Sequence, residues 1–127
     1  MIAILALQAA LGAIGQQQLP TTACAAFLWS LGDRPALVAR AEPGTLRIRL
    51  NDVPLDLPRI AVEGGVTMGL GASTRYGTGT VSATLELTIG ERPALANGAV
   101  VPSAILTVER PGRDAIVTPL AGMIGCG

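Results

Sequence analysis

Apolar and polar residues alternate along much of this chain from Pro20 onward. The clearest run is residues 80–89, where the two kinds exchange at every step. Its apolar members are Val81, Ala83, Leu85, Leu87 and Ile89, and its polar members are Thr80, Ser82, Thr84, Glu86 and Thr88. Because successive side chains of a strand point to opposite faces, this period predicts a strand with one face in the core. Residues 45–50 alternate in the same way.

Turn-forming residues arrange these predicted strands as hairpins. The strand pairs are 24–30 with 36–41, 45–50 with 53–57, 66–76 with 80–89, and 104–108 with 115–124. Asn51-Asp52 is a candidate two-residue turn, because Asn and Asp tolerate the positive φ angles that two-residue hairpin loops require. Pro54 and Pro58 cannot donate to a hydrogen-bond ladder, so we expect the arm at 53–57 to be an edge strand.

About six to eight short strands, with no amphipathic helix after the first residues, predict an all-β domain. Two architectures satisfy this pattern, a small antiparallel barrel and a sandwich. Glycines are concentrated between Gly64 and Gly79, where we expect bulges and corners that let the strands curve. Only Phe27, Trp29 and Tyr76 are aromatic, so the core is expected to be aliphatic, with Trp29 packed inside it near the cysteines.

The first 15 residues have the pattern of an export signal. An apolar run at 2–14 ends in Ala13-Ile14-Gly15, which offers small residues at the two positions that a signal peptidase reads, and polar residues follow. We therefore expect cleavage before Gln16 and a single domain at 16–127, located in the periplasm or secreted. The run is too short to span a bilayer as a helix. One alternative is a buried N-terminal helix. Another is that the natural chain starts further upstream, since no Lys or Arg precedes the run.

The chain has two cysteines, Cys24 near the start of the expected domain and Cys126 next to its end. In an oxidising compartment, two thiols in a small domain are expected to form a disulfide. A bond between the first and last strands suggests that these strands are neighbours, as in a closed barrel.

The composition restricts the chemistry that is open to the chain. It has no His and no Lys, and nine Arg balance nine acidic residues. Ser–His and Cys–His pairs, Schiff-base lysines and histidine metal sites are therefore excluded. A neutral, aromatic-poor chain also lacks the features of a nucleic-acid-binding protein. No cofactor or metal motif is present, so we expect a protein without enzymatic activity; an enzyme would have to use acids such as Asp52 and Asp56.

The polar faces of the predicted strands offer only surface chemistry. Arg47 and Arg49 stand on one face of their strand, where pairing with surface carboxylates is favoured over binding of an anionic ligand. The Thr-rich face of residues 80–88 is typical of a solvated strand.

Three segments occur in the order found in a known family. They are the hairpin at 45–57, the sequence Ala72-Ser73-Thr74-Arg75-Tyr76, and Ile89-Gly90-Glu91. In this order the chain resembles the small periplasmic inhibitors of c-type lysozyme. The resemblance implies an eight-stranded barrel with a disulfide from its first strand to its C-terminus.

The resemblance also implies a loop at 72–79 that enters the lysozyme cleft. Ser73 stands for the loop serine of that family, although Thr74 follows it where the family has a glycine, and the position of the family's lysine is Ile89 here. Arg75 would replace this lysine as the group that pairs with acids in the cleft. Tyr76 would act as an anchor in the contact.

These observations favour an exported, non-enzymatic binding or inhibitor module of the bacterial cell envelope, with a lysozyme as the partner that the resemblance implies. The alternative is a structural or accessory envelope domain without a discrete site. The sequence leaves the oligomeric state and the strand order open.

Overall fold

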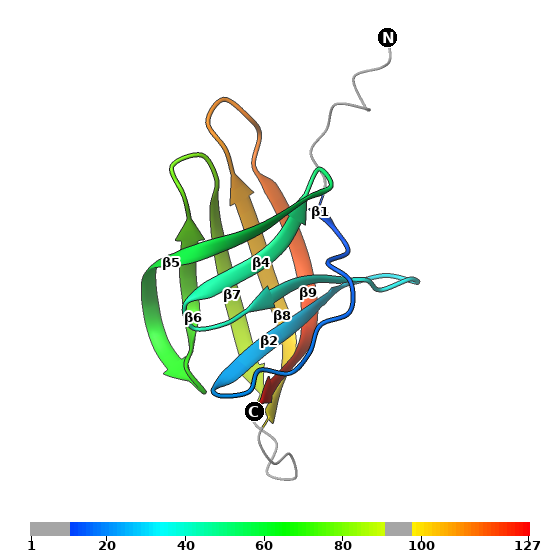
Figure 1. The fold of residues 1–127 in the computed structure, drawn as a ribbon, viewed down its shortest axis with the longest axis vertical. Coiled ribbons are helices and arrows are strands. Elements are labelled where there is room, and N and C mark those ends of the chain that lie inside the picture. Colours follow the sequence, from blue (N-terminus) through cyan, green and yellow to red (C-terminus); the bar gives the residue numbers. More distant parts are fainter. Residues whose placement is uncertain (1–10, 91–97) are drawn as a thin grey trace.

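A computed structural model describes residues 11–90 and 98–127, and these residues form nine β-strands and no helix (Figure 1). The strands are β1 (Leu11–Gly12), β2 (Cys24–Ser30), β3 (Leu37–Ala41), β4 (Thr45–Leu50), β5 (Val53–Thr67), β6 (Leu70–Gly77), β7 (Ser82–Gly90), β8 (Gly98–Glu109) and β9 (Ile116–Cys126). All ladders between them are antiparallel.

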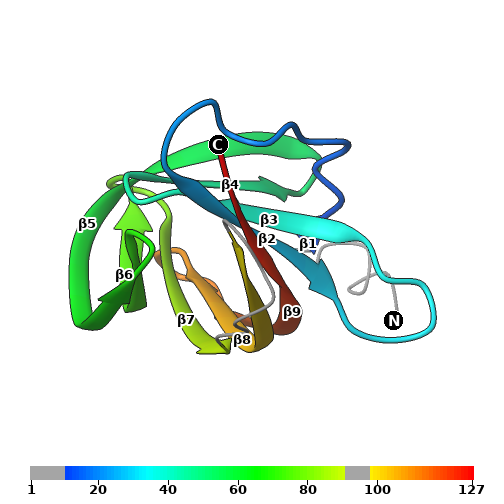
Figure 2. The ribbon, with the colours of Figure 1, turned by 90° about the horizontal axis from the view of Figure 1, so that it is seen from below.

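The sheet closes on itself, so the barrel and not the sandwich is the architecture. The strand order is β1-β4-β3-β2-β9-β8-β7-β6-β5, and a further pairing between β4 and β5 joins the two sides. Eight strands, β2 to β9, form the ring, and β1 is an additional strand on β4. Figure 2 shows the ring nearly end on. The all-β fold expected from the sequence is confirmed.

The long strand β5 makes closure possible because it belongs to two parts of the ring. Its first half, as far as Pro58, pairs with β4, and its second half pairs with β6. The register shifts at two places in the second half, and Gly64 takes a φ of 80° at one of them. Bulges of this kind bend a strand, as β5 does in Figure 1. Pro54 and Pro58 lie in the first half of β5, which pairs with β4 on one side only. This half is therefore the edge strand that the two prolines predicted.

Two tight turns connect β5 to its neighbours. Asn51 and Asp52 have φ angles of 50° and 65°, which confirms the two-residue hairpin turn expected there. A second turn of this type, at Met68 and Gly69 with φ of 55° and 83°, was not expected. The strand predicted at 66–76 is therefore wrong at its start, because the chain reverses at Gly69 and β6 begins only at Leu70.

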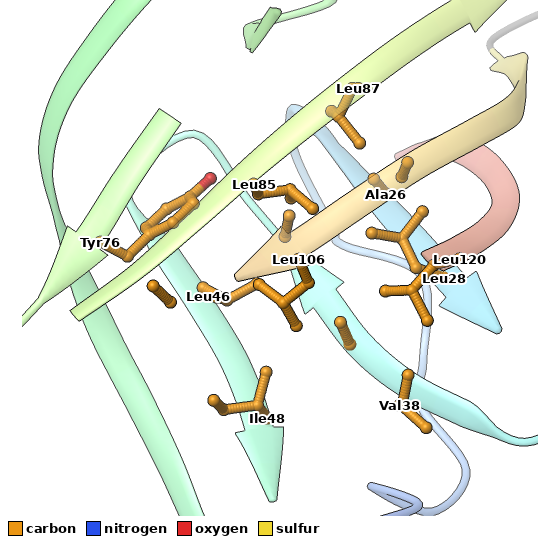
Figure 3. Packing of buried hydrophobic residues seen from close by; sticks show 14 of the residues in the cluster. Ala26, Leu28, Val38, Leu46, Ile48, Tyr76, Leu85, Leu87, Leu106 and Leu120 are labelled. Carbon is orange, nitrogen blue, oxygen red and sulfur yellow. The ribbon is translucent and has the colours of Figure 1, made fainter. Parts of the chain in front are cut away.

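The core fills the inside of the barrel with aliphatic side chains from strands all around it, as the composition predicted (Figure 3). Its most completely buried members, each 2% exposed or less, include Leu28, Leu46, Ile48, Leu57, Leu70, Leu85, Val101, Leu106, Val108 and Leu120. They are the inward-facing members of the alternating patterns. Tyr76 is the one aromatic residue among these core side chains.

The disulfide joins the two strands at the ends of the barrel sequence. Cys24 and Cys126 lie directly opposite each other in the β2–β9 ladder and are bonded. The backbone N–H of Gly127 donates to the carbonyl of Ala23 at 3.0 Å, which continues the pairing beyond the bond. The predicted disulfide and the predicted adjacency of the first and last strands are confirmed.

Trp29 does not lie where the sequence placed it. In β2, Ala26 and Leu28 face the core, so the neighbouring Phe27 and Trp29 face outward. Trp29 is paired with Ala121, five positions along the strand from Cys24, and is only partly buried. Phe27 is nevertheless only 7% exposed, and the Arg40 guanidinium lies over its ring, 5.6 Å from the ring centre.

Candidate functional site

The residues singled out by sequence, Ser73, Arg75 and Tyr76, lie on strand β6 and not on a loop. Arg75 is paired with Ala61 on one side and with Thr84 on the other. The loop predicted at 72–79 is therefore wrong, and only the turn after Gly77 protrudes. Ser73 and Arg75 face outward, whereas Tyr76 is 1% exposed and belongs to the core.

The position of Tyr76 gives it a structural role. Its hydroxyl donates a hydrogen bond of 3.0 Å to the carbonyl of Glu42, in the turn between β3 and β4. Burial of the ring raises the pKa of Tyr76 from 10.0 to about 12. The side chain therefore connects β6 with the turn between β3 and β4 and is not available as a surface anchor.

We expect the Tyr76→Phe variant to lose about 1 kcal/mol of stability, the usual effect of one buried hydrogen bond. Because the folded-state pKa is raised, the contribution of Tyr76 is complete below pH 10.0 and is lost as the pH rises toward about 12. The variant should lack this loss. Tyr76 is the only tyrosine, so phenolate absorbance during an alkaline titration reports it directly. A midpoint equal to that of the urea-unfolded chain would contradict the burial.

The third segment of the family resemblance is described only in part. Ile89 is half-buried near the end of β7. Glu91 lies outside the described residues.

A different surface has the features of a binding site, and it begins on β9. The outward-facing residues of this strand are all apolar: Val117, Pro119, Ala121, Met123 and Gly125. Val117 and Met123 are 62% and 55% exposed. The inward-facing Leu120 and Ile124 are buried, so β9 is apolar on both faces. The sequence signal was present, since no charged residue occurs from Ile116 to the end of the chain.

The segment between β1 and β2 crosses the outside of the barrel next to this strand (Figure 2). The N–H of Ile14 donates to the carbonyl of Leu37 at 2.9 Å, which holds one end of the segment on β3. Further along, Gln17 accepts a hydrogen bond of 2.8 Å from Arg47 of β4. Leu19 lies so close to Gly125 that a Cβ at this glycine would approach within 2.7 Å of its side chain.

An apolar groove of about 510 Å³ lies between this segment and the barrel. Its walls are the side chains of Leu19, Phe27, Trp29, Leu37 and Met123, which come from the crossing segment and from strands β2, β3 and β9. Gln16 and Gln17 are the polar side chains of the lining, and no charged residue belongs to it. This volume and this kind of lining are typical of sites that bind small apolar ligands.

A small charged hollow of about 200 Å³ lies on the same outer face. In it, Arg40 forms an ion pair of 3.1 Å with Glu42, and Arg47 forms one of 2.8 Å with Asp56. The hydrogen bond to Asp56 raises the pKa of Arg47 above its usual value. Thr45 completes the lining. Pairing of Arg47 with a surface carboxylate is thus confirmed, and Asp56 is the partner.

The groove and the hollow are adjacent. One cross-strand row runs over five strands through Met123, Phe27, Arg40, Arg47 and Asp56, each the register partner of the next. The Phe27 ring lines the groove. The Arg40 guanidinium lies over the same ring, 5.6 Å from its centre, in a cation–π contact.

Comparison with family models, with curated proteins and with solved structures gives no match to this chain. In the part of the chain that the structure describes, no helix is long and apolar enough to cross a membrane. Within residues 11–90 and 98–127, no group of three or more His, Cys, Asp or Glu side chains is placed to hold a metal ion.

Proposed function

We propose that the protein is an exported, non-enzymatic binding module of the cell envelope and that the outer groove is its binding site. The observation that carries the proposal is the open apolar concavity lined by Phe27, Trp29 and Met123. Monomeric proteins rarely leave such surfaces uncovered unless they bind something there. The leader-like N-terminus and the Cys24–Cys126 disulfide support the export part of the proposal.

The groove lining supports binding over catalysis. None of its side chains titrates near neutral pH, so the groove itself offers no general acid or base. Aromatic rings and the thioether of Met123 adapt to apolar ligands of varied shape. We therefore expect the ligand to place an uncharged, apolar part in the groove.

Inhibition of a c-type lysozyme stays a prediction of the sequence resemblance. Ser73 and Arg75 share the outward face of β6, but they lie on a paired strand, which presents a flat surface to a cleft. The geometry therefore favours the groove as the site. A lysozyme lysis assay tests this prediction. Inhibition by the wild-type protein that is lost in the Arg75→Ala variant would support it, and no inhibition by the wild-type protein would reject it.

We expect the uncharged fluorophore N-phenyl-1-naphthylamine to bind the wild-type protein with saturable enhancement of its emission. Met123→Asp should remove most of this enhancement, because it places a charge in the groove. Val117→Asp is the matched control, since Val117 is on the same face of β9 and equally accessible, but outside the groove lining. Circular dichroism checks that both variants fold.

No binding by the wild-type protein would reject the groove as a site. Equal loss in both variants would mean that the whole outer face of β9, and not the groove, receives the probe.

A further inference from the structure

We propose that the groove receives the single alkyl chain of a zwitterionic amphiphile and that the charged hollow receives its head group. This inference rests on the proposed function, because it names the class of ligand that the groove binds. It depends on three observations: the size and lining of the groove, the charge balance of the hollow, and the residues that connect the two.

The groove has the capacity for an alkyl chain. The groove volume is about 510 Å³ and most of its lining is apolar, which gives room for such a chain. Leu37 and Met123 come from strands on either side of β2, so a chain lying across Phe27 and Trp29 contacts apolar side chains along its length.

The hollow has the charge pattern of a zwitterion. It contains two guanidinium groups and two carboxylates, so its formal charge is zero. In the Arg47–Asp56 pair the two side chains are 42% and 55% exposed, and exposed ion pairs contribute at most about 1 kcal/mol, so a ligand can replace Asp56 as the partner of Arg47. Arg40, in contrast, is only 14% exposed. A phosphate is a strong, bidentate partner for a guanidinium, and an ammonium group is a partner for the carboxylate that this exchange releases.

Two side chains connect the groove with the hollow. Phe27 lines the groove and stacks under Arg40 of the hollow. Gln17 also lines the groove, and it accepts the hydrogen bond from Arg47. A ligand whose chain lies on Phe27 therefore has its charged end beside Arg40 and Arg47, as in a lysophospholipid with an ethanolamine head.

The test uses Trp29, the only tryptophan, as a probe inside the groove. Lauroyl lysophosphatidylethanolamine, added below its critical micelle concentration to the full chain and to the chain that begins at Gln16, should shift the Trp29 emission of both to shorter wavelength with saturation. Dodecyl maltoside and dodecyl phosphate carry comparable chains with an uncharged and an anionic head. We expect both to bind at least about tenfold more weakly than the zwitterion.

Arg47→Gln should reduce the affinity for the zwitterion by a larger factor than the affinity for dodecyl maltoside, whose smaller loss would report the missing hydrogen bond to Gln17 of the groove. Arg49→Gln is the matched control and should change neither affinity. Arg49 lies on the same face of the same strand, but it donates to the carbonyl of Asp52 at 3.2 Å and does not line the hollow.

Each other outcome overturns the proposal at a defined point. Equal affinity for the three amphiphiles, or equal effects of the two arginine variants, would reject the hollow as the head-group site. Binding of N-phenyl-1-naphthylamine without binding of any amphiphile would reject this ligand class and leave the binding groove standing. If neither kind of probe binds, the proposed function fails as well.

Discussion

The Leu85→Asp variant should be unfolded, whereas Thr84→Asp, one residue earlier, should fold like the wild type. Leu85 is 1% exposed and lies between Thr74 and Leu106 in the ladders of the barrel. A carboxylate at this position would be buried without a partner, which costs far more than a change at the surface. Small domains are stable by only about 5–15 kcal/mol, so this change is expected to remove the folded state.

Thr84 is the control because its side chain faces outward on the same strand. Its register partner on β6 is Arg75, so a carboxylate at this position would stand opposite a positive charge. The expected change is within about 0.5 kcal/mol. Circular dichroism and urea unfolding measure both variants. Equal damage from both substitutions would contradict the one-sided burial of β7.

The second large effect is expected at the disulfide. Cys24→Ser should lower the free energy of unfolding by about 2–5 kcal/mol, because the bond constrains an unfolded chain over a sequence separation of 102 residues. Urea unfolding gives this value. Reduction of the wild-type protein should cause a comparable loss, and the double variant Cys24→Ser/Cys126→Ser should be no less stable than the single one.

Mass spectrometry provides an independent check of the bond. Protein purified from an oxidising compartment should be two hydrogens lighter than its reduced form. Two free thiols in that material, or a reduced protein as stable as the oxidised one, would contradict the structural role of the bond.

Alternation predicted the strands that have one core face and one solvated face. It succeeded for β4 and β7, because their outward residues are Thr, Arg, Ser and Glu. It did not predict which face of β9 lies in the core. The outward side chains of β9 are also apolar, so the sequence pattern does not distinguish the inner face from the outer one. It also placed Val66 in the wrong strand, because a single positive-φ pair at Met68 and Gly69 reverses the chain without interrupting the apolar run.

The groove could not be predicted from the sequence. Its walls combine the segment around Leu19 with Phe27, Leu37 and Met123, which only the closed order of strands brings together. Local pattern says which side of a strand is apolar, but not which strands become neighbours. The family resemblance directed attention to Ser73 and Arg75 instead, where the chain forms a regular paired strand.

The predicted export signal overlaps with described structure at its end. Strand β1 pairs with Leu50 and Arg49 of β4 but is not part of the closed ring, so cleavage before Gln16 would leave all eight barrel strands intact. It would remove the contact between Ile14 and Leu37, together with the Ala13 and Gly15 part of the groove wall. The groove of the cleaved chain would then be more open at the β3 end.

The bond between the first and last strands of the barrel also makes the barrel sequence a covalent macrocycle. A protease that cuts once within it linearises the ring but releases no fragment. The exposed turn at Arg113 offers trypsin such a position, between β8 and β9. The nicked protein would migrate as one species until it is reduced, and only then would β9 separate from the rest of the chain. A nick in this loop would therefore not be equivalent to degradation.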